Sequence, residues 1–249
     1  ERWRFDPGLP KDIQYSSSAS RGVSLGHGSA AVCPSRIFLG TLIGELIALD
    51  ALTGEPCSDF GVNGRVDLSK GAGSVELGEY SITSPPAILG DLVIVGSAIG
   101  DNRATDLERG IVRAIDAQTG SIQWLWDPIP KSTNDKARAT WNGDSNLSTG
   151  AANAWAPLTA DPSSGLIYVP TSSPSPDFFG GERLGDNLYS NSIVALNGFT
   201  GEVVWFQQLV HHDLWDYDIP AQPTLTTIRR EGEVHQAVIV VTKTGMLFA

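Results

Sequence analysis

The chain has 249 residues, of which 41% are apolar and 18% charged, and this composition is sufficient to bury the core of one large all-β domain. Its 17 Lys and Arg and 28 Asp and Glu give a formal net charge of −11, which argues against nucleic-acid binding, because phosphate contacts require clustered basic residues. No apolar run reaches the roughly 18 residues of a membrane-spanning helix.

Three segments share one pattern and predict how the strands are organised. They read "ALDALTGEPCS" from Ala48, "AIDAQTGSIQW" from Ala114 and "ALNGFTGEVVW" from Ala195. In each, an apolar run predicts a strand. The Asp or Asn and the Thr-Gly that follow it predict a turn, and the next residues predict a returning strand.

Tryptophan marks the same repeat. Trp124 and Trp205 lie four residues after the glycine of their segments, whereas the first segment has Ser58 there. The opening "ERWRFD" resembles the tail of the motif, with Trp3 in the tryptophan position, and the final "KTGMLFA" resembles "LIGELIA" around Leu46. We therefore expect a chain that starts and stops within a repeat and forms part of a longer protein.

Further apolar runs, "RIFLG", "DLVIVGS", "GLIYVP" and "QAVIVVT", also predict strands, and helical periodicity is nearly absent. Four-stranded units that repeat at this spacing are typical of a β-propeller, in which each unit needs neighbours to bury its faces. The sequence thus predicts an all-β fold in which residues 1–249 form one partial propeller domain of about four blades.

Two other features remain open from the residues alone. The polar stretch at 127–153 predicts either a functional loop or a disordered insertion. Cys33 and Cys57 either form a disulfide or remain two separate buried thiols, because their spacing does not decide between them.

The stretch "HHDLWDYD", residues 211–218, carries the densest group of reactive side chains. Its adjacent histidines make a weak zinc signal, since neighbours on a strand point to opposite faces. In an extended run, Asp216 and Asp218 would share one face, and Trp215 and Tyr217 the other. Two carboxylates on one face fit a hard cation or acid/base chemistry. On composition alone, a polar turn with aromatic anchors is the favoured interpretation.

The Trp-containing repeat, "HHDLWDYDIPAQPTL" and "TKTGMLFA" together resemble the quinoprotein dehydrogenases, over essentially the whole chain. These are eight-bladed propellers that carry pyrroloquinoline quinone (PQQ). The branch that the sequence most resembles comprises the membrane-bound glucose, quinate and polyol dehydrogenases. The resemblance implies four of eight blades and a chemical role for several residues.

By this resemblance, Asp216 of "HDLWD" is the catalytic base and Lys243 of "TKTG" hydrogen-bonds the quinone oxygens. Trp155 of "NAWAPL" is the aromatic floor for the cofactor ring, and Arg21 and Thr83 hold its carboxylates and oxygens. These types suit a planar anion with three carboxylates. The remaining residues carried over are the metal ligands Asp101 and Asn102, which act with Asp216, and the cofactor-binding residue Ser173, which occupies the place of a metal-binding Asn of the methanol dehydrogenases.

Three departures refine the resemblance. Ser17 occupies a position at which glucose dehydrogenases have His, which puts glucose in doubt as the substrate. "SSSAS" has no Cys for the vicinal disulfide of the methanol dehydrogenases. Asp218, two residues after Asp216, has the spacing of lanthanide-using enzymes but also occurs in the glucose branch. We expect Ca²⁺ or Mg²⁺ rather than a lanthanide.

In the same stretch, we expect His211 and His212 to hold the loop through hydrogen bonds, and Asp213 to cap or brace it. The loop would then present Asp216 toward the cofactor, and the histidines would not form a zinc site.

The resemblance predicts PQQ-dependent oxidation of an alcohol, polyol, sugar or cyclic hydroxy-acid, with electrons passed to a quinone or cytochrome. It implies a periplasmic location, with any membrane anchor upstream of Glu1, and this favours a Cys33–Cys57 disulfide. Two alternatives are a non-catalytic propeller scaffold for protein assembly and a carboxylate-pair glycoside hydrolase. Neither requires Asp101, Trp155, Asp216 and Lys243 together.

Overall fold

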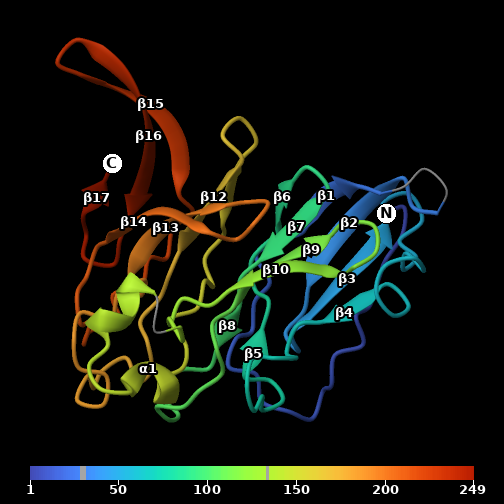
Figure 1. The fold of residues 1–249 in the computed structure, drawn as a ribbon. Coiled ribbons are helices and arrows are strands. Elements are labelled where there is room, and N and C mark those ends of the chain that lie inside the picture. Colours follow the sequence, from blue (N-terminus) through green and yellow to red (C-terminus); the bar gives the residue numbers. More distant parts are fainter. Residues whose placement is uncertain (29–31, 133–134) are drawn as a thin grey trace.

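The computed structural model describes residues 1–28, 32–132 and 135–249 and consists mostly of antiparallel strands and their connections. Within these residues, three four-stranded sheets and then a three-stranded sheet follow one another along the chain (Figure 1). The fold confirms the predicted propeller blades. Figure 1 shows the first sheet on the right and the long β15–β16 hairpin projecting at the upper left.

The strands of the four sheets have the following bounds. The first sheet contains β1 (Ser24–His27), β2 (Ser35–Gly40), β3 (Glu45–Asp50) and β4 (Arg65–Asp67). The second contains β6 (Ala87–Leu89), β7 (Leu92–Val95), β9 (Val112–Asp116) and β10 (Ile122–Trp126). The third contains β11 (Thr159–Asp161), β12 (Leu166–Pro170), β13 (Ser192–Asn197) and β14 (Val203–Gln208). The last contains β15 (Thr224–Arg230), β16 (Glu233–Val241) and β17 (Leu247–Phe248).

Four short elements lie in the connections. β5 (Tyr80–Ser81) and β8 (Ala98–Ile99) pair with each other. A 3-10 helix at Lys136–Thr140 and the one-turn helix α1 (Ser145–Ser148) order the polar stretch at 127–153, whose residues 133–134 lie outside the described part. In the part of the chain that the structure describes, no helix is long and apolar enough to span a bilayer.

The hydrophobic core lies between neighbouring sheets, because successive side chains of a strand face opposite ways. On β7, Val93 packs in the cluster that contains Phe38 of the first sheet, whereas the next residue, Ile94, packs in the cluster that contains Val194 of the third sheet. The first strands also contact one another, with β6 between β1 and β11. Each central sheet is therefore buried on both faces, which explains its nearly continuous apolar runs.

The repeated Asp/Asn-x-x-Thr-Gly segments form the predicted turns. The Oδ1 atoms of Asp50, Asp116 and Asn197 each accept hydrogen bonds from the backbone N–H groups two and three residues later, at 2.7–3.2 Å. The glycine that ends each turn has a φ of +74° to +78°, a conformation that glycine adopts without strain. The turn is therefore specified by local sequence, as expected.

The repeated tryptophan joins one sheet to the next. The Trp124 indole, on β10, lies against the turn at Gly201, and its Nε1 donates to the Gly198 carbonyl at 2.9 Å. Trp3 makes the equivalent contact with the turn at Gly54 and donates to the Ala51 carbonyl at 3.2 Å. A side chain on either glycine would collide with the indole ring.

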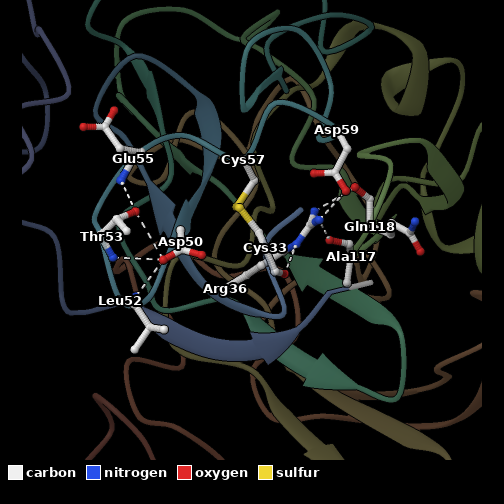
Figure 2. Close-up of a disulfide and its surroundings, with 10 residues drawn as sticks. All are labelled: Cys33, Arg36, Asp50, Leu52, Thr53, Glu55, Cys57, Asp59, Ala117 and Gln118. Atoms are coloured by element: carbon white, nitrogen blue, oxygen red, sulfur yellow. Dashed lines mark hydrogen bonds and ion pairs between the residues drawn. A yellow bond between two sulfur atoms is a disulfide. The ribbon is translucent and has the colours of Figure 1, made fainter. Parts of the chain in front are cut away.

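The junction between the first and second sheets is built differently. The expected returning strand does not directly follow Gly54, because Cys57 is held in a disulfide with Cys33 and β4 begins only at Arg65 (Figure 2). The loop that follows Cys57 approaches the next turn, where the Gly61 N–H donates to the Thr119 carbonyl at 2.9 Å. The disulfide predicted from the resemblance is confirmed.

Candidate functional site

A cavity of about 230 Å³ opens where the connections of the second, third and last sheets meet. Its wall is strongly acidic, and we call it the acidic pocket. The described residues that line it include Ser16, Ser17, Thr83, Asp101, Asn153, Trp155, Ser172, Ser173, Asp177, Asp216, Asp218 and Lys243. Lys243 is the only basic side chain among the described lining residues, so negative charge is in excess.

Trp155 lies on the pocket wall and is fixed through both its backbone and its side chain. Ser84 Oγ donates to the Trp155 carbonyl at 2.5 Å, and Thr83 Oγ1 reaches the same oxygen at 3.5 Å. The Trp155 Nε1 donates to Asp218 Oδ2 at 2.9 Å. The Arg21 guanidinium lies 4.9 Å from the centroid of its ring and the Lys243 ammonium 6.0 Å away. A flat ring with two cations near it is suited to a planar anion.

Arg21 reaches this place because its segment runs along residues 78–83. The Ser16 N–H donates to the Gly78 carbonyl at 3.0 Å, and the Arg21 N–H donates to the Thr83 carbonyl at 2.7 Å. Arg21 itself is exposed, whereas Thr83 is buried.

The 211–218 stretch is a kinked loop, and not the extended run that the alternation argument assumed. Asp213 accepts the Trp215 N–H on Oδ1 at 3.1 Å and the Tyr217 N–H on Oδ2 at 2.7 Å, so it caps the loop as expected. His212 Nδ1 lies 2.8 Å from the Gly185 carbonyl, which agrees with a structural role. His211 is exposed and has no hydrogen bond to its side chain within the described residues.

Asp216 and Asp218 nevertheless face the same cation. The backbone at Asp216 has a φ of +56°, so the chain turns sharply there. Lys243 Nζ donates to Asp216 Oδ1 at 2.9 Å and to Asp218 Oδ2 at 3.1 Å. Burial would lower the pKa of Lys243, but the charges and hydrogen bonds of these two carboxylates more than offset burial and raise it.

Sequence reasoning missed Asp177, which lies in the β12–β13 connection and is only 2% exposed. Asn102 Nδ2 donates to Asp177 Oδ2 at 3.0 Å, and the Asp177 N–H donates to Asn102 Oδ1 at 3.0 Å. Burial, followed by the negative charges of Asp101, Asp218 and Asp216, raises the pKa of Asp177 to about 8. The pattern that could have revealed it is an acidic residue placed between Pro176 and two phenylalanines.

Asp218 shows the same crowding of negative charge. Burial and the neighbouring Asp216 raise its pKa to about 6, although Lys243, the Ser173 N–H and the Trp155 indole act in the opposite direction.

Ser173 lines the pocket, but its hydroxyl is already hydrogen-bonded within the protein. Its Oγ donates to Asp213 Oδ2 at 2.5 Å and accepts from Asn191 Nδ2 at 3.0 Å, while its backbone N–H donates to Asp218 Oδ1 at 2.8 Å. The four residues that carry these atoms are all buried. The hydroxyl therefore braces Asp213, and the predicted role of Ser173 in cofactor binding stays a prediction.

The predicted residues are thus brought together to different degrees. One pocket is lined by Thr83, Asp101, Trp155, Ser173, Asp216 and Lys243. Arg21 lies near the Trp155 ring, and Asn102 donates to the carboxylates of Asp101 and Asp177. Across the described ranges, no three His, Cys, Asp or Glu side chains are grouped closely enough to hold a metal ion on their own. The metal ligand set also stays a prediction.

Residues 1–249 match the family described as "PQQ: Glucose/ethanol/alcohol dehydrogenase, beta-propeller domain". Quinoprotein glucose dehydrogenase A of Acinetobacter calcoaceticus is 35% identical over 100% of this chain and 33% of its own length. Quinate/shikimate dehydrogenase (quinone) of Acinetobacter baylyi is 37% identical over 87% of this chain and 27% of its own.

Among solved structures, quinohemoprotein alcohol dehydrogenase from Comamonas testosteroni has a TM-score of 0.83 and 28% identity, and the alignment covers 99% of this chain and 36% of that one. The chain therefore spans about a third of the length of these proteins.

Proposed function

The chain belongs to the PQQ-dependent glucose/ethanol/alcohol dehydrogenase β-propeller family, and on that premise we propose that it supplies the active site of a PQQ-dependent dehydrogenase. The substrate is an alcohol, polyol, sugar or cyclic hydroxy-acid such as quinate. The observation that carries the proposal is the Trp155 ring with Arg21 and Lys243 near it, beside Asp216 in one pocket. Neither a scaffold nor a carboxylate-pair hydrolase requires this arrangement.

The side chains present fit the cofactor. PQQ is flat and carries three carboxylates, and the chain offers a flat indole, two cations at that indole and a threonine hydroxyl. Trp155 would hold the ring by stacking, while Arg21 and Thr83 would bind its anionic oxygens. Lys243 would serve both the cofactor oxygens and the acid/base group, since its ammonium carries three N–H donors.

The proposed chemistry divides between the cofactor and the chain. PQQ, when bound, supplies the carbonyl carbon that accepts hydride from the substrate. Asp216 accepts the proton of the substrate hydroxyl. Within the described residues only Oδ1 of Asp216 is hydrogen-bonded, to Lys243, so Oδ2 is the atom that takes the proton. Lys243 stabilises negative charge next to that proton acceptor.

A divalent cation also fits the pocket. Asp101, Asp177, Asp216 and Asp218 all line the pocket, where Lys243 donates to Asp216 and Asp218, and burial followed by the acidic neighbours raises the pKa of Asp177 to about 8. Ca²⁺ and Mg²⁺ prefer oxygen ligands, and the carboxylates of Asp101 and Asp216 offer them here. Because the acidic side chains do not form a complete ligand set, the ion would take further oxygens from PQQ.

We place the protein in the periplasm, with electrons leaving to a quinone or cytochrome. The Cys33–Cys57 disulfide supports this location, since disulfides persist in oxidising compartments.

The first experiment reconstitutes the complete polypeptide with PQQ and Ca²⁺ and measures dye-linked oxidation across alcohols, polyols, sugars and quinate. Asp216→Asn should lower kcat by about 10²–10⁴-fold while PQQ still binds, because the amide keeps the shape but cannot take a proton. Asp161→Asn, in a surface turn, is the matched control and should leave kcat unchanged. No oxidation of any substrate by the PQQ-loaded enzyme would refute the proposal.

A further inference from the structure

Asp218 makes more contacts than its neighbour Asp216, although only one residue separates them. The Asp218 side chain is 8% exposed and the Asp216 side chain 31% exposed. Asp218 Oδ1 accepts the Ser173 N–H at 2.8 Å, and its Oδ2 accepts both the Trp155 indole N–H at 2.9 Å and Lys243 Nζ at 3.1 Å. One carboxylate thus receives three donors.

The three donors come from three separate parts of the fold. Ser173 belongs to the β12–β13 connection, Trp155 to the segment that enters the third sheet, and Lys243 follows β16. A carboxylate has about four lone-pair positions, and these three contacts occupy most of them. Two of the three donors are also the groups assigned to hold PQQ, so the position of Asp218 determines where both stand.

The hydrogen bond from the Trp155 indole to Asp218 restricts the orientation of the Trp155 ring. A tryptophan ring rotates about its side-chain bonds unless its N–H is held, and an N–H donated to a carboxylate is a strong constraint. The Ser173 contact fixes Asp218 in turn through the backbone, so it does not depend on a mobile side chain.

We propose that Asp218 is a positioning residue that sets the plane of the Trp155 ring and the place of the Lys243 ammonium, and that it is not a ligand of the ion. This inference rests on the proposed function. It gives the Asp216–Asp218 spacing a different meaning from the one that lanthanide-using enzymes suggest: Asp216 faces the reaction, and Asp218 orients the groups that hold the cofactor.

The test is a double-mutant cycle in the complete enzyme, read as the Kd of PQQ at a fixed Ca²⁺ concentration. Trp155→Phe keeps an aromatic ring but removes the N–H donor. Asp218→Asn keeps the shape but replaces one acceptor oxygen with a donor, so a contact must be lost. Each variant alone should weaken PQQ binding by roughly ten- to a hundredfold, the range of a charged hydrogen bond. The double variant should be hardly worse than Asp218→Asn alone, because Trp155→Phe removes only a bond that Asp218→Asn has already disrupted.

The matched control is Asp213→Asn, the same substitution at a buried carboxylate of the same loop. Asp213 has no hydrogen bond to Trp155 or Lys243 within the described residues. Its effect on the Kd of PQQ should therefore add to that of Trp155→Phe. Additive effects of Asp218→Asn and Trp155→Phe would overturn the proposal.

A second readout separates orientation from metal ligation. The Ca²⁺ concentration for half-reconstitution should change less than about twofold in Asp218→Asn and rise by tenfold or more in Asp101→Asn, as expected when a ligand is lost. An equal rise in both variants would make Asp218 a ligand and overturn the proposal.

Two further outcomes are decisive. If Asp218→Asn does not fold, Trp155→Phe alone decides, since unchanged PQQ affinity in that variant would show that the indole N–H has no such role. If the unsubstituted enzyme binds no PQQ, the proposed function fails as well, whereas normal binding with additive effects refutes only the role of Asp218.

Discussion

Two of the places where this chain buries charge differ in how that charge is balanced. At the junction of the first and second sheets, the fully buried Arg36 donates to the carbonyls of Cys33, Ala117 and Gln118 and to the Asp59 carboxylate (Figure 2). We call this group the Arg36 cluster. One cation meets one anion there, and three neutral carbonyls accept further bonds from the same guanidinium.

In the acidic pocket, by contrast, four carboxylates line the wall together with one lysine, which donates to two of them. Burial and then the acidic neighbours raise the pKa of Asp177 to about 8, and burial and then Asp216 raise that of Asp218 to about 6. At the Arg36 cluster, the buried positive charge is thus balanced by a carboxylate of the fold itself. The pocket keeps an excess of negative charge, which a bound cation would neutralise.

The largest effect should come from breaking the Arg36 cluster. Arg36→Ala empties a fully buried position and leaves the Asp59 carboxylate, whose side chain is 23% exposed, and several carbonyls without this partner, so the free energy of unfolding of the complete polypeptide should fall by about 3 kcal/mol. Denaturant unfolding at neutral pH measures it. Arg230→Ala, whose side chain is 75% exposed, is the control and should change stability by less than about 0.5 kcal/mol. A similar small effect for Arg36→Ala would show that the cluster is not structural.

Removing the neighbouring disulfide should have the next largest effect. Cys33 and Cys57 are 24 residues apart, and opening a loop of that length costs about 3 kcal/mol in the chain-entropy description. The Cys33→Ser/Cys57→Ser double variant should lose about that much in denaturant unfolding. Reducing agent should destabilise the unsubstituted protein and leave the double variant unchanged; equal sensitivity of both would contradict the assignment.

In the acidic pocket, replacing a carboxylate by an amide should raise the free energy of unfolding, whereas the two changes above lower it. Without divalent ions, the folded protein keeps the Asp177 proton up to about pH 8, whereas the unfolded chain loses it near the ordinary carboxyl value. Stability therefore falls as pH rises through this window. Asp177→Asn should remove that decline and raise stability at pH 8 by on the order of 2 kcal/mol, with no gain at pH 3.

Unfolding curves at the two pH values check this result. Asp144→Asn, at an 86% exposed side chain, is the matched control and should show no pH-dependent gain. Destabilisation by Asp177→Asn at both pH values would mean that the carboxylate is needed for the fold.

The smallest effect should be that of the cation itself. At ten times its Kd, Ca²⁺ should raise the free energy of unfolding by about 1.4 kcal/mol. The gain should shrink in Asp101→Asn and persist when the Arg36 cluster is altered. An equal gain in every variant would indicate that Ca²⁺ acts away from the pocket.

The sequence predicted local features better than distant ones. The turns at Asp50, Asp116 and Asn197 were predictable because all their bonds lie within three residues. The Arg36 cluster was not, since two of its three carbonyl partners lie 81 and 82 residues from Arg36 and leave no local pattern. The resemblance supplied most residues of the pocket, but Asp177 gains its burial only when the β12–β13 connection packs against Asn102. The extended reading of 211–218 was wrong because Asp213 caps a kink there.

The tryptophan contacts between sheets also set an order of events during protein synthesis. The indole of Trp124 binds a carbonyl 74 residues further along the chain, and that of Trp3 one 48 residues further. At translation rates of about 5–20 residues per second, Trp124 emerges roughly 4–15 s before its partner. During that interval the turn that covers the Trp124 indole has not yet been made, so the nascent chain exposes this ring to solvent. Slowed translation between residues 124 and 201 would lengthen the period in which that edge is open to chaperones or to aggregation.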